Sequence, residues 1–271
     1  MMARVGSSGS RTPGKHALLN SITGRESGVA LHLTPASRYI MIDLTAGTGL
    51  PDQHSGTSSP EILIKHMRIA NTRRAGQSEV VLVEKAGNHA AHLLTRYSEV
   101  VGTTIIEGDA RSPELIGTIW RGGDCVFINN DPNKITDFAL TEELLQRLPH
   151  KTTTLSTLGC NASGLKRLPK EDRDGWYDHA NLVRDMLRRR RHHDALLVAL
   201  ERDSDQWAYL ITGPSKWRAH YERDAREAFK GWEKGVRMVW ATDSGRFGQE
   251  LDRLFRTGQE RAEALYAGGL F

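Results

Sequence analysis

Short, continuously apolar segments alternate with segments of helical length through the middle of the sequence. The segments expected as strands are "RYIMIDL" from residue 38, "SEVVLVEK" from 78, "TTIIEGDA" from 103, "DCVFINND" from 124 and "TTTLSTLG" from 152. Continuous apolar runs are typical of strands that are covered on both faces. The pattern therefore predicts an α/β protein whose mostly parallel sheet has helices on both faces.

Helices are expected between and after these strands, over residues 60–74, 88–100, 112–121, 140–148 and 174–190. The first of them opens with Pro60, which suits the first turn of a helix because its missing N–H is not needed there. Ile62, Ile64, Met67 and Ile69 then follow at roughly helical spacing.

The end of the alternating region changes character. "HDALLVALE" and "QWAYLITG", residues 193–201 and 206–213, are too close for a crossover helix and must form an antiparallel hairpin. Together with the five strands before it, this hairpin predicts a seven-stranded sheet. A helix over 215–232, a strand over 235–243 and a closing amphipathic helix are expected after it.

The chain is expected to fold as one globular domain with an irregular beginning. Residues 1–15 are rich in Gly, Ser and Arg and indicate a disordered basic tail. Residues 16–33 have no clean period and indicate an irregular lead-in, with or without a short helix. We therefore expect a flexible basic tail and lead-in over 1–37, the main domain over 38–213, and a helical extension packed on the same domain over 214–271.

Composition narrows the class of protein. No stretch approaches the roughly 20 apolar residues of a membrane helix, and the first residues lack the apolar part of a secretory signal, so a cytoplasmic protein is expected. Cys125 and Cys160 lack metal-type spacing, so neither a metal site nor a disulfide is expected.

The basic residues of the sequence are compatible with a nucleic-acid partner but do not require one. The formal charge of +4 favours polyanions without requiring them. The cluster "RRRRHH" at 188–193 fits a solvated helix terminus at least as well as a nucleic-acid contact. Four tryptophans near the C-terminus are expected in the core rather than on a stacking surface: Trp207, Trp217, Trp232 and Trp240.

Carboxylates stand where the expected strands end. Asp43 precedes the turn "AGTG", Glu84 ends the second strand, Asp109 follows the third, and "NNDPN" follows the fourth. Ligands of open α/β sheets bind at the carboxyl ends of the strands. Glycines let the backbone approach a ligand, and carboxylates can accept from ribose hydroxyls or an adenine amino group. This set predicts a pocket for an adenosine-containing ligand.

Two other nucleotide motifs fit less well. No lysine follows the turn, so it is not a phosphate-binding P-loop, and "AGTGLP" lacks the third glycine of the dinucleotide fingerprint.

The strand ends, taken in order, carry a family resemblance. The succession "DLTAGTG", "VEK" and "GDA" with a terminal hairpin resembles the class I S-adenosylmethionine-dependent methyltransferases, from about Tyr39 to Gly213. Within that superfamily, "YIMIDLTAGTG" followed by a polar loop and "SSPEIL" is similar to the three-Cys-motif partner type.

The resemblance implies a role for each strand end. The residues implied to bind the methionine part of S-adenosylmethionine and to shape the turn are Asp43, Ala46, Gly47 and Gly49. Glu84 would hold the ribose hydroxyls, and Asp109 with Ala110 would meet the adenine.

The fourth strand end departs from the family pattern. Asn130, Asp131 and Pro132 occupy the position of an Asp/Asn-Pro-Pro-aromatic motif that binds the target amine in amino-methyltransferases. In "NDPNK" both the second proline and the aromatic residue are missing, which puts methylation of a base amine in doubt. Asp131 is either the residue that orients an acceptor or an ordinary turn residue.

The expected function is an S-adenosylmethionine-dependent methyltransferase that acts on nucleic acid, RNA or DNA. Two alternatives stay open: a non-catalytic, methyltransferase-like binding or partner subunit, and a nicotinamide-cofactor enzyme. The long polar loop "LPDQHSGTSSP" is either a lid that carries His54 toward a substrate or a tolerated insertion. The acceptor atom and the oligomeric state are not encoded in these motifs.

Overall fold

The computed structural model describes residues 12–33, 38–74, 77–112, 119–121, 123–131, 144, 147–149, 151–159, 192–202, 205–230, 235–243 and 245–250. The strands are β1 (Tyr39–Asp43), β2 (Ser78–Glu84), β3 (Thr103–Glu107), β4 (Cys125–Asn130), β5 (Lys151–Gly159), β6 (His193–Arg202), β7 (Asp205–Pro214) and β8 (Val236–Trp240). The helices are α1 (Thr12–Leu33), α2 (Ser59–Arg73), α3 (Gly87–Tyr97), the short 3-10 helix η2 (Ser215–Trp217) and α8 (Arg218–Ala228).

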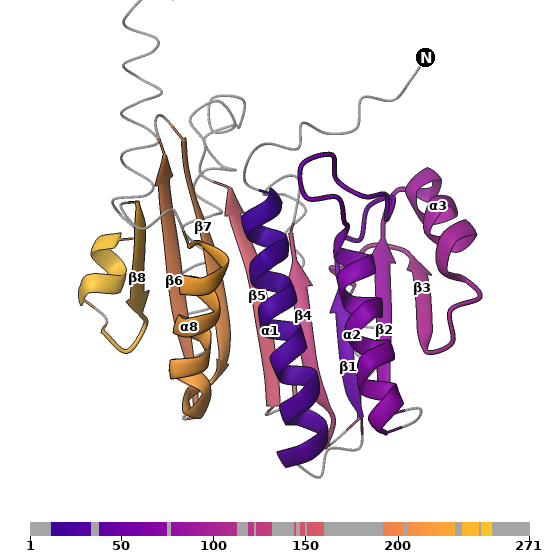
Figure 1. The fold of residues 1–271 in the computed structure, drawn as a ribbon, viewed down its shortest axis with the longest axis horizontal. Helices are drawn as coiled ribbons and strands as arrows, with labels where there is room; N and C mark the ends of the chain where they lie inside the picture. The colour runs from indigo at the N-terminus through magenta and orange to yellow at the C-terminus, as the bar shows by residue number, and fades with distance from the viewer. Residues whose placement is uncertain are drawn as a thin grey trace, which may run out of the picture.

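All eight strands belong to one sheet, in the order β3-β2-β1-β4-β5-β7-β6-β8 (Figure 1). The pairs among β1 to β5 are parallel, whereas β7 is antiparallel to both β5 and β6. The mostly parallel sheet and its terminal antiparallel hairpin are therefore confirmed.

The expected number of strands was wrong by one. β8 pairs antiparallel with β6, on the side of β6 that faces away from β7. A hairpin that ended the sheet would leave the backbone N–H and C=O groups of β6 unpaired at an edge, and β8 satisfies them. The strand expected over 235–243 is thus part of the main sheet.

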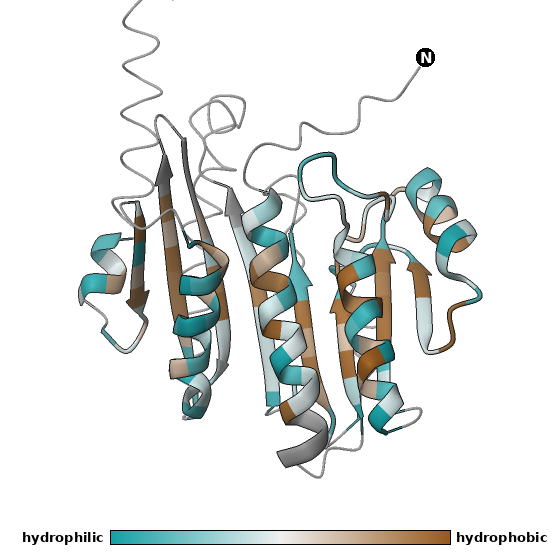
Figure 2. Ribbon diagram, in the orientation of Figure 1, coloured by the Kyte–Doolittle hydropathy of each residue, from teal (hydrophilic) through white to brown (hydrophobic). Residues whose placement is uncertain are grey.

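Each face of the sheet carries its own apolar cluster. Tyr39 and Met41 of β1 point to the face that α1, α2 and α8 cover side by side (Figure 1). Ile40 and Ile42 point to the other face and belong to a second cluster, which also includes Leu144 and Phe247. Figure 2 shows largely apolar strands behind helices in which polar and apolar residues alternate. Trp217 is buried in the first cluster, and Trp240 packs against it half-buried.

The N-terminal region differs most from expectation. Residues 12–33 form α1, a helix of 22 residues, instead of a tail and an irregular lead-in. The buried positions recur at helical spacing: His16, Leu18, Leu19, Ile22, Thr23, Glu26 and Ser27. Because several of these residues are polar, the helical period is absent from the apolar pattern alone.

Several expectations lie outside the described residues. These are Pro132, Cys160, Trp232, the arginines of 188–191, the helix over 174–190, and most of the helices over 112–121 and 140–148. None of the helices that the structure describes has the length and apolarity to cross a bilayer.

Candidate functional site at the carboxyl ends of the strands

The carboxyl ends of β1 and β4 lie side by side at the upper edge of the sheet in Figure 1, together with the start of α1 and the loop between β1 and α2. Asp43 is the cross-strand neighbour of Asn129, whose Nδ2 donates to Asp43 Oδ1 at 3.0 Å. The backbone N–H of Asp131 donates to Thr45 Oγ1, also at 3.0 Å. These bonds fix the two strand ends relative to each other.

Four buried polar atoms at this edge find no hydrogen-bond partner among the described residues: Asp43 Oδ2, Asn129 Oδ1, and Nδ2 and Oδ1 of Asn130. Leaving such an atom unsatisfied costs on the order of 1–3 kcal/mol. Burial raises the pKa of Asp43, whereas the Asn129 amide and the backbone N–H of Thr45, which both donate to Oδ1, oppose that rise by stabilising the carboxylate. A ligand with complementary donors and acceptors would relieve this cost.

The glycine turn after β1 has one open side and one closed side. Gly47 has φ of +62°, and a Cβ there would meet nothing within 4 Å. Gly49 has φ of +66°, and a Cβ there would approach Tyr97 and Leu93 of α3 to within 2.7 and 2.8 Å. Gly47 therefore borders open space that a ligand can enter, while Gly49 lets α3 pack against the turn.

Glu84 is held against the same turn. Its Oε2 accepts from the backbone N–H of Gly47 at 2.8 Å, and its Oε1 accepts from that of Ala86 at 2.9 Å. Each carboxylate oxygen has a second lone-pair direction. The side chain is therefore oriented by the backbone and retains acceptor capacity for hydroxyl groups, as the predicted ribose contact requires.

Asp109 lies beyond the end of β3, next to the end of β2. Arg111 donates to its carboxylate through Nε at 2.9 Å, and Lys85 Nζ lies 3.1 Å away. The Arg111 side chain, with a smaller contribution from Lys85, holds the pKa of Asp109 well below its usual range. The predicted adenine contact would have to share this carboxylate with Arg111. Ala110 is buried beside it.

Asp131 is paired with a residue from the other end of the sequence. Lys15 of α1 donates from Nζ to Asp131 Oδ2, and the two side chains are 16% and 26% exposed. Asn130, the last residue of β4, is fully buried beside this ion pair. Pro132, the third member of the predicted acceptor motif, lies outside the described residues.

The loop between β1 and α2 is ordered by its own hydrogen bonds. Asp52 Oδ1 accepts from the backbone N–H groups of His54 and Ser55, and Ser58 caps α2 together with Glu61.

His16 of α1 contacts the same loop, at Ser55 Oγ, through Nδ1 at 2.7 Å. Burial, together with neighbouring Lys15, lowers the pKa of His16 to about 4, so its ring is neutral at neutral pH. His54 borders a cavity of about 430 Å³ between this loop, α1 and α2.

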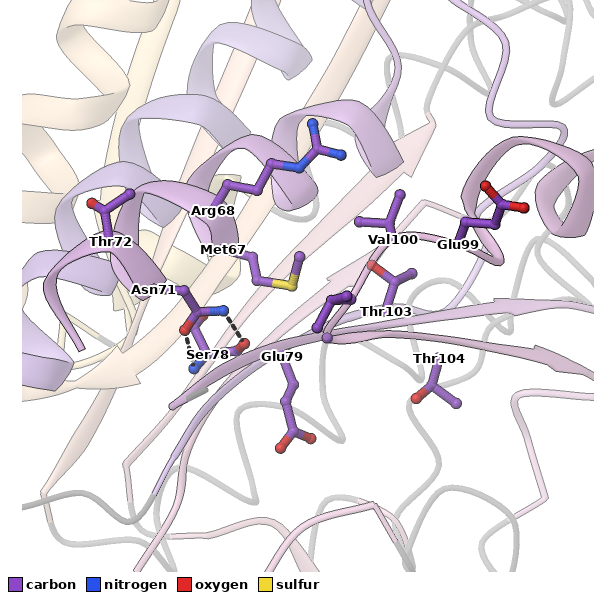
Figure 3. Close-up of a pocket in the computed structure, with 12 residues that line it drawn as sticks. Met67, Arg68, Asn71, Thr72, Ser78, Glu79, Glu99, Val100, Thr103 and Thr104 are labelled. Atoms are coloured by element: carbon purple, nitrogen blue, oxygen red, sulfur yellow. Dashed lines mark hydrogen bonds between the residues drawn. The ribbon is translucent and has the colours of Figure 1, made fainter. Parts of the chain in front are cut away.

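A second cavity, of about 810 Å³, lies at the opposite ends of β2 and β3 (Figure 3). Met67 points toward it, and Asn71 makes two hydrogen bonds of 2.9 Å to the backbone of Ser78 beside it. None of the predicted site residues lines this cavity. The strand-end cluster is therefore the better candidate for the functional site.

The structure brings together most of the residues predicted from the sequence and adds others. Asp43, Gly47, Glu84 and Asp131 converge on one edge, and Asp109 lies at its margin. Sequence reasoning missed Lys15, His16, Thr45 and Asn129. No periodic or motif signal marks the first two, because they lie in a segment whose buried face is largely polar.

No protein-family model matches the sequence, and no curated protein matches it either. Among solved structures, protein LPL1258 from Legionella pneumophila is similar, with a TM-score of 0.53 and 11% identity over 83% of this chain and 96% of that chain. An O-methyltransferase from Bacillus cereus has a TM-score of 0.47 and 14% identity over 78% of this chain and 83% of that chain. An rRNA methylase from Streptococcus thermophilus has a TM-score of 0.43 and 12% identity over 74% and 93%.

At these identities the similarity concerns the fold alone, and the sheet itself defines that fold. Five parallel strands are continued by an antiparallel hairpin in which the later strand, β7, is inserted next to β5. The chain therefore has the class I S-adenosylmethionine-dependent methyltransferase fold.

Proposed function

We propose that the chain is an S-adenosylmethionine-dependent methyltransferase. The observation that carries this proposal is the group of buried, unpartnered polar atoms on Asp43, Asn129 and Asn130, beside the open side of Gly47. A structure does not retain such atoms without cost, and a polar ligand that enters along Gly47 would satisfy them.

The residues present fit this cofactor. Asp43 Oδ2 can accept from an ammonium group, the Asn130 amide can both donate and accept, and Glu84 can accept from vicinal hydroxyls. S-adenosylmethionine, when bound, supplies a methyl group already activated by its sulfonium. The chain therefore needs to bind, to orient the acceptor and to exclude water rather than to supply a strong base. We assign the orientation of the acceptor to Asp131.

For the acceptor we propose a nucleic acid, RNA or DNA. The support is the excess of basic residues, which gives a formal charge of +4. Labelling of RNA or DNA with tritiated S-adenosylmethionine, at two salt concentrations, tests this assignment. Labelling only of small metabolites would overturn it. Cofactor binding and salt-sensitive RNA binding without any labelling would instead support the non-catalytic partner subunit.

The cofactor assignment is tested by calorimetric titration with S-adenosylhomocysteine, with a nicotinamide dinucleotide titrated in parallel. We expect micromolar affinity for the sulfur ligand only, and a roughly tenfold or greater loss in Glu84→Gln, because a hydrogen bond to a charged acceptor contributes about 1.5–3 kcal/mol.

Glu79→Gln is the matched control for this experiment. Glu79 lies on the same strand, but at its other end, where it pairs with Arg38 at 3.0 Å. Its substitution should leave the affinity unchanged. Equal losses in the two variants, or binding of the dinucleotide instead, would contradict the proposed cofactor.

A further inference from the structure

We propose that Lys15 is a positioning residue of the methyl-acceptor site, which holds the Asp131 carboxylate in place at the carboxyl end of β4. The inference rests on the methyltransferase function proposed above. The strand-end motifs assign no role to this lysine, and the sequence predicts it in a disordered tail.

Three elements meet at Asp131: the end of β4, the turn after β1, and α1. The backbone of Asp131 is fixed by its N–H bond to Thr45 Oγ1 in the β1 turn, at 3.0 Å. Its side chain is fixed by Lys15, which α1 brings from 116 positions away in the sequence. Because Lys15 engages Oδ2, an acceptor would be oriented by the other oxygen, Oδ1.

The charges of the pair depend on each other. Burial alone would raise the pKa of Asp131, but Lys15 lowers it below its usual value, with smaller contributions from Thr157 and His16. Burial would likewise lower the pKa of Lys15, but Asp131, and then Asp43 and Asp52, raise it. Both groups are therefore charged at neutral pH.

The position of Lys15 is set by the packing of α1 as a whole. Leu18, Leu19 and Ile22, on the following turns, are fully buried. Gly14, directly before Lys15, lies so close to Phe229 that a Cβ would come within 2.6 Å of its ring. A lysine held this closely is not a surface side chain that meets a carboxylate by chance.

These observations define what Lys15 can do. A lysine whose pKa is raised stays protonated and cannot accept a proton from the acceptor. It acts through Asp131, by keeping that carboxylate ionised and pointed in one direction. The site is thus complete only when α1 is docked on the sheet.

Lys15→Met tests the proposal, because it keeps the length of the side chain and removes the charge. We expect the pKa of Asp131 to rise, as measured by carbon-13 NMR of its carboxyl and assigned with Asp131→Asn. The acid limb of the pH profile for labelling of RNA or DNA should move up by about one unit or more. At pH 7 kcat should fall about tenfold or more, while S-adenosylhomocysteine affinity changes less than threefold.

Two further variants make the result specific. Lys15→Arg keeps the positive charge and should restore the acid limb, even if kcat recovers only in part. Lys216→Met removes an exposed lysine at the amino end of β5 and should leave every readout unchanged. If Lys15→Met fails to fold, as judged by circular dichroism, Lys15→Gln replaces it as the variant without the charge and is compared with Lys15→Arg.

The outcomes separate this inference from the proposed function. A wild-type chain that neither binds S-adenosylhomocysteine nor labels RNA or DNA would overturn the function itself. An active wild type whose Lys15→Met variant keeps its acid limb and its kcat would overturn only the positioning role. A loss of cofactor affinity that parallels the loss of kcat would also overturn it, because Lys15 would then serve the cofactor.

Discussion

The two glycines of the β1 turn share a left-handed backbone but have different surroundings, and substitution should separate their roles. In Gly47→Ala and Gly49→Ala alike, the positive φ costs about 1–2 kcal/mol. In Gly49→Ala the new methyl group also collides with Tyr97 and Leu93, which should add about 1–3 kcal/mol. Urea unfolding should therefore rank Gly49→Ala as the less stable variant.

Ligand binding should show the opposite ranking. The methyl group of Gly47→Ala projects into the open space beside Glu84, where the ligand is expected to bind. Gly47→Ala should therefore bind S-adenosylhomocysteine more weakly than Gly49→Ala does, although it is the more stable of the two variants. Calorimetry on the folded fraction of each variant measures this difference. Equal affinities in the two variants would mean that the ligand does not approach the turn at Gly47.

The sequence allows some site residues to be predicted and hides others for a physical reason. Asp43, Glu84 and Asp109 could be predicted because a parallel sheet brings its strand ends to one edge, and this rule needs no knowledge of side-chain contacts. Lys15 and Asn129 are bound at this edge by partners that are distant in the sequence, Asp131 and Asp43. Their positions depend on how helices and strands pack, and a local sequence pattern carries no information on that packing.

At the scale of elements, α1 shows why apolar periodicity alone can fail. Its buried face includes Thr23, Glu26 and Ser27 as well as leucine and isoleucine, so a pattern of apolar residues is incomplete. Glu26 is tolerated there because Thr153 Oγ1 donates to it at 2.7 Å. The strands were predictable because every position of β1 and β4 is buried and most are apolar.

Two glycines within α1 provide a test of how closely this helix packs. A Cβ at Gly28 would meet nothing within 4 Å, whereas a Cβ at Gly24 would lie 2.8 Å from His66 Cε1 on α2. Gly28→Ala should stabilise the protein by up to about 1 kcal/mol, because alanine is the better helix former. Gly24→Ala should instead destabilise it by about 1–3 kcal/mol through overpacking.

Thermal or urea unfolding of these two variants measures both signs in one experiment. The pair is matched, because each variant makes the same substitution in the same helix, one turn apart. Two stabilised variants would show that α1 can shift away from α2 without cost, and that the position of Lys15 is less fixed than its packing indicates.

At the scale of the whole molecule, Glu26 joins α1 to both the sheet and α8. Thr153 of β5, Tyr39 of β1 and Tyr221 of α8 all place hydroxyl groups within 3.3 Å of its carboxyl oxygens. Burial raises the pKa of Glu26 from 4.5 to about 7, although these hydroxyls and Arg25 oppose the rise. The protonation of one side chain is thereby linked to the packing of α1 against both the sheet and α8.

The pH dependence of global stability should reveal this linkage. A raised carboxyl pKa means that the folded state holds a proton that the unfolded state releases, so the contribution of Glu26 to stability is greatest below pH 4.5 and falls as the pH rises to about 7. The fall amounts to about 1.4 kcal/mol per pH unit, roughly 3 kcal/mol in total. His16 and His66, whose pKa values burial lowers to about 4, contribute in the opposite direction between pH 4 and 6.5.

Glu26→Gln isolates the contribution of Glu26, because the histidines are present in both proteins and cancel in the comparison. Urea unfolding at pH 5, 6 and 7 should give a wild type that loses stability relative to Glu26→Gln with each step. At pH 7 the variant should be the more stable protein if glutamine keeps the bond from Thr153. Parallel stability curves would show instead that Glu26 titrates alike in both states, and that water reaches it between α1 and the sheet.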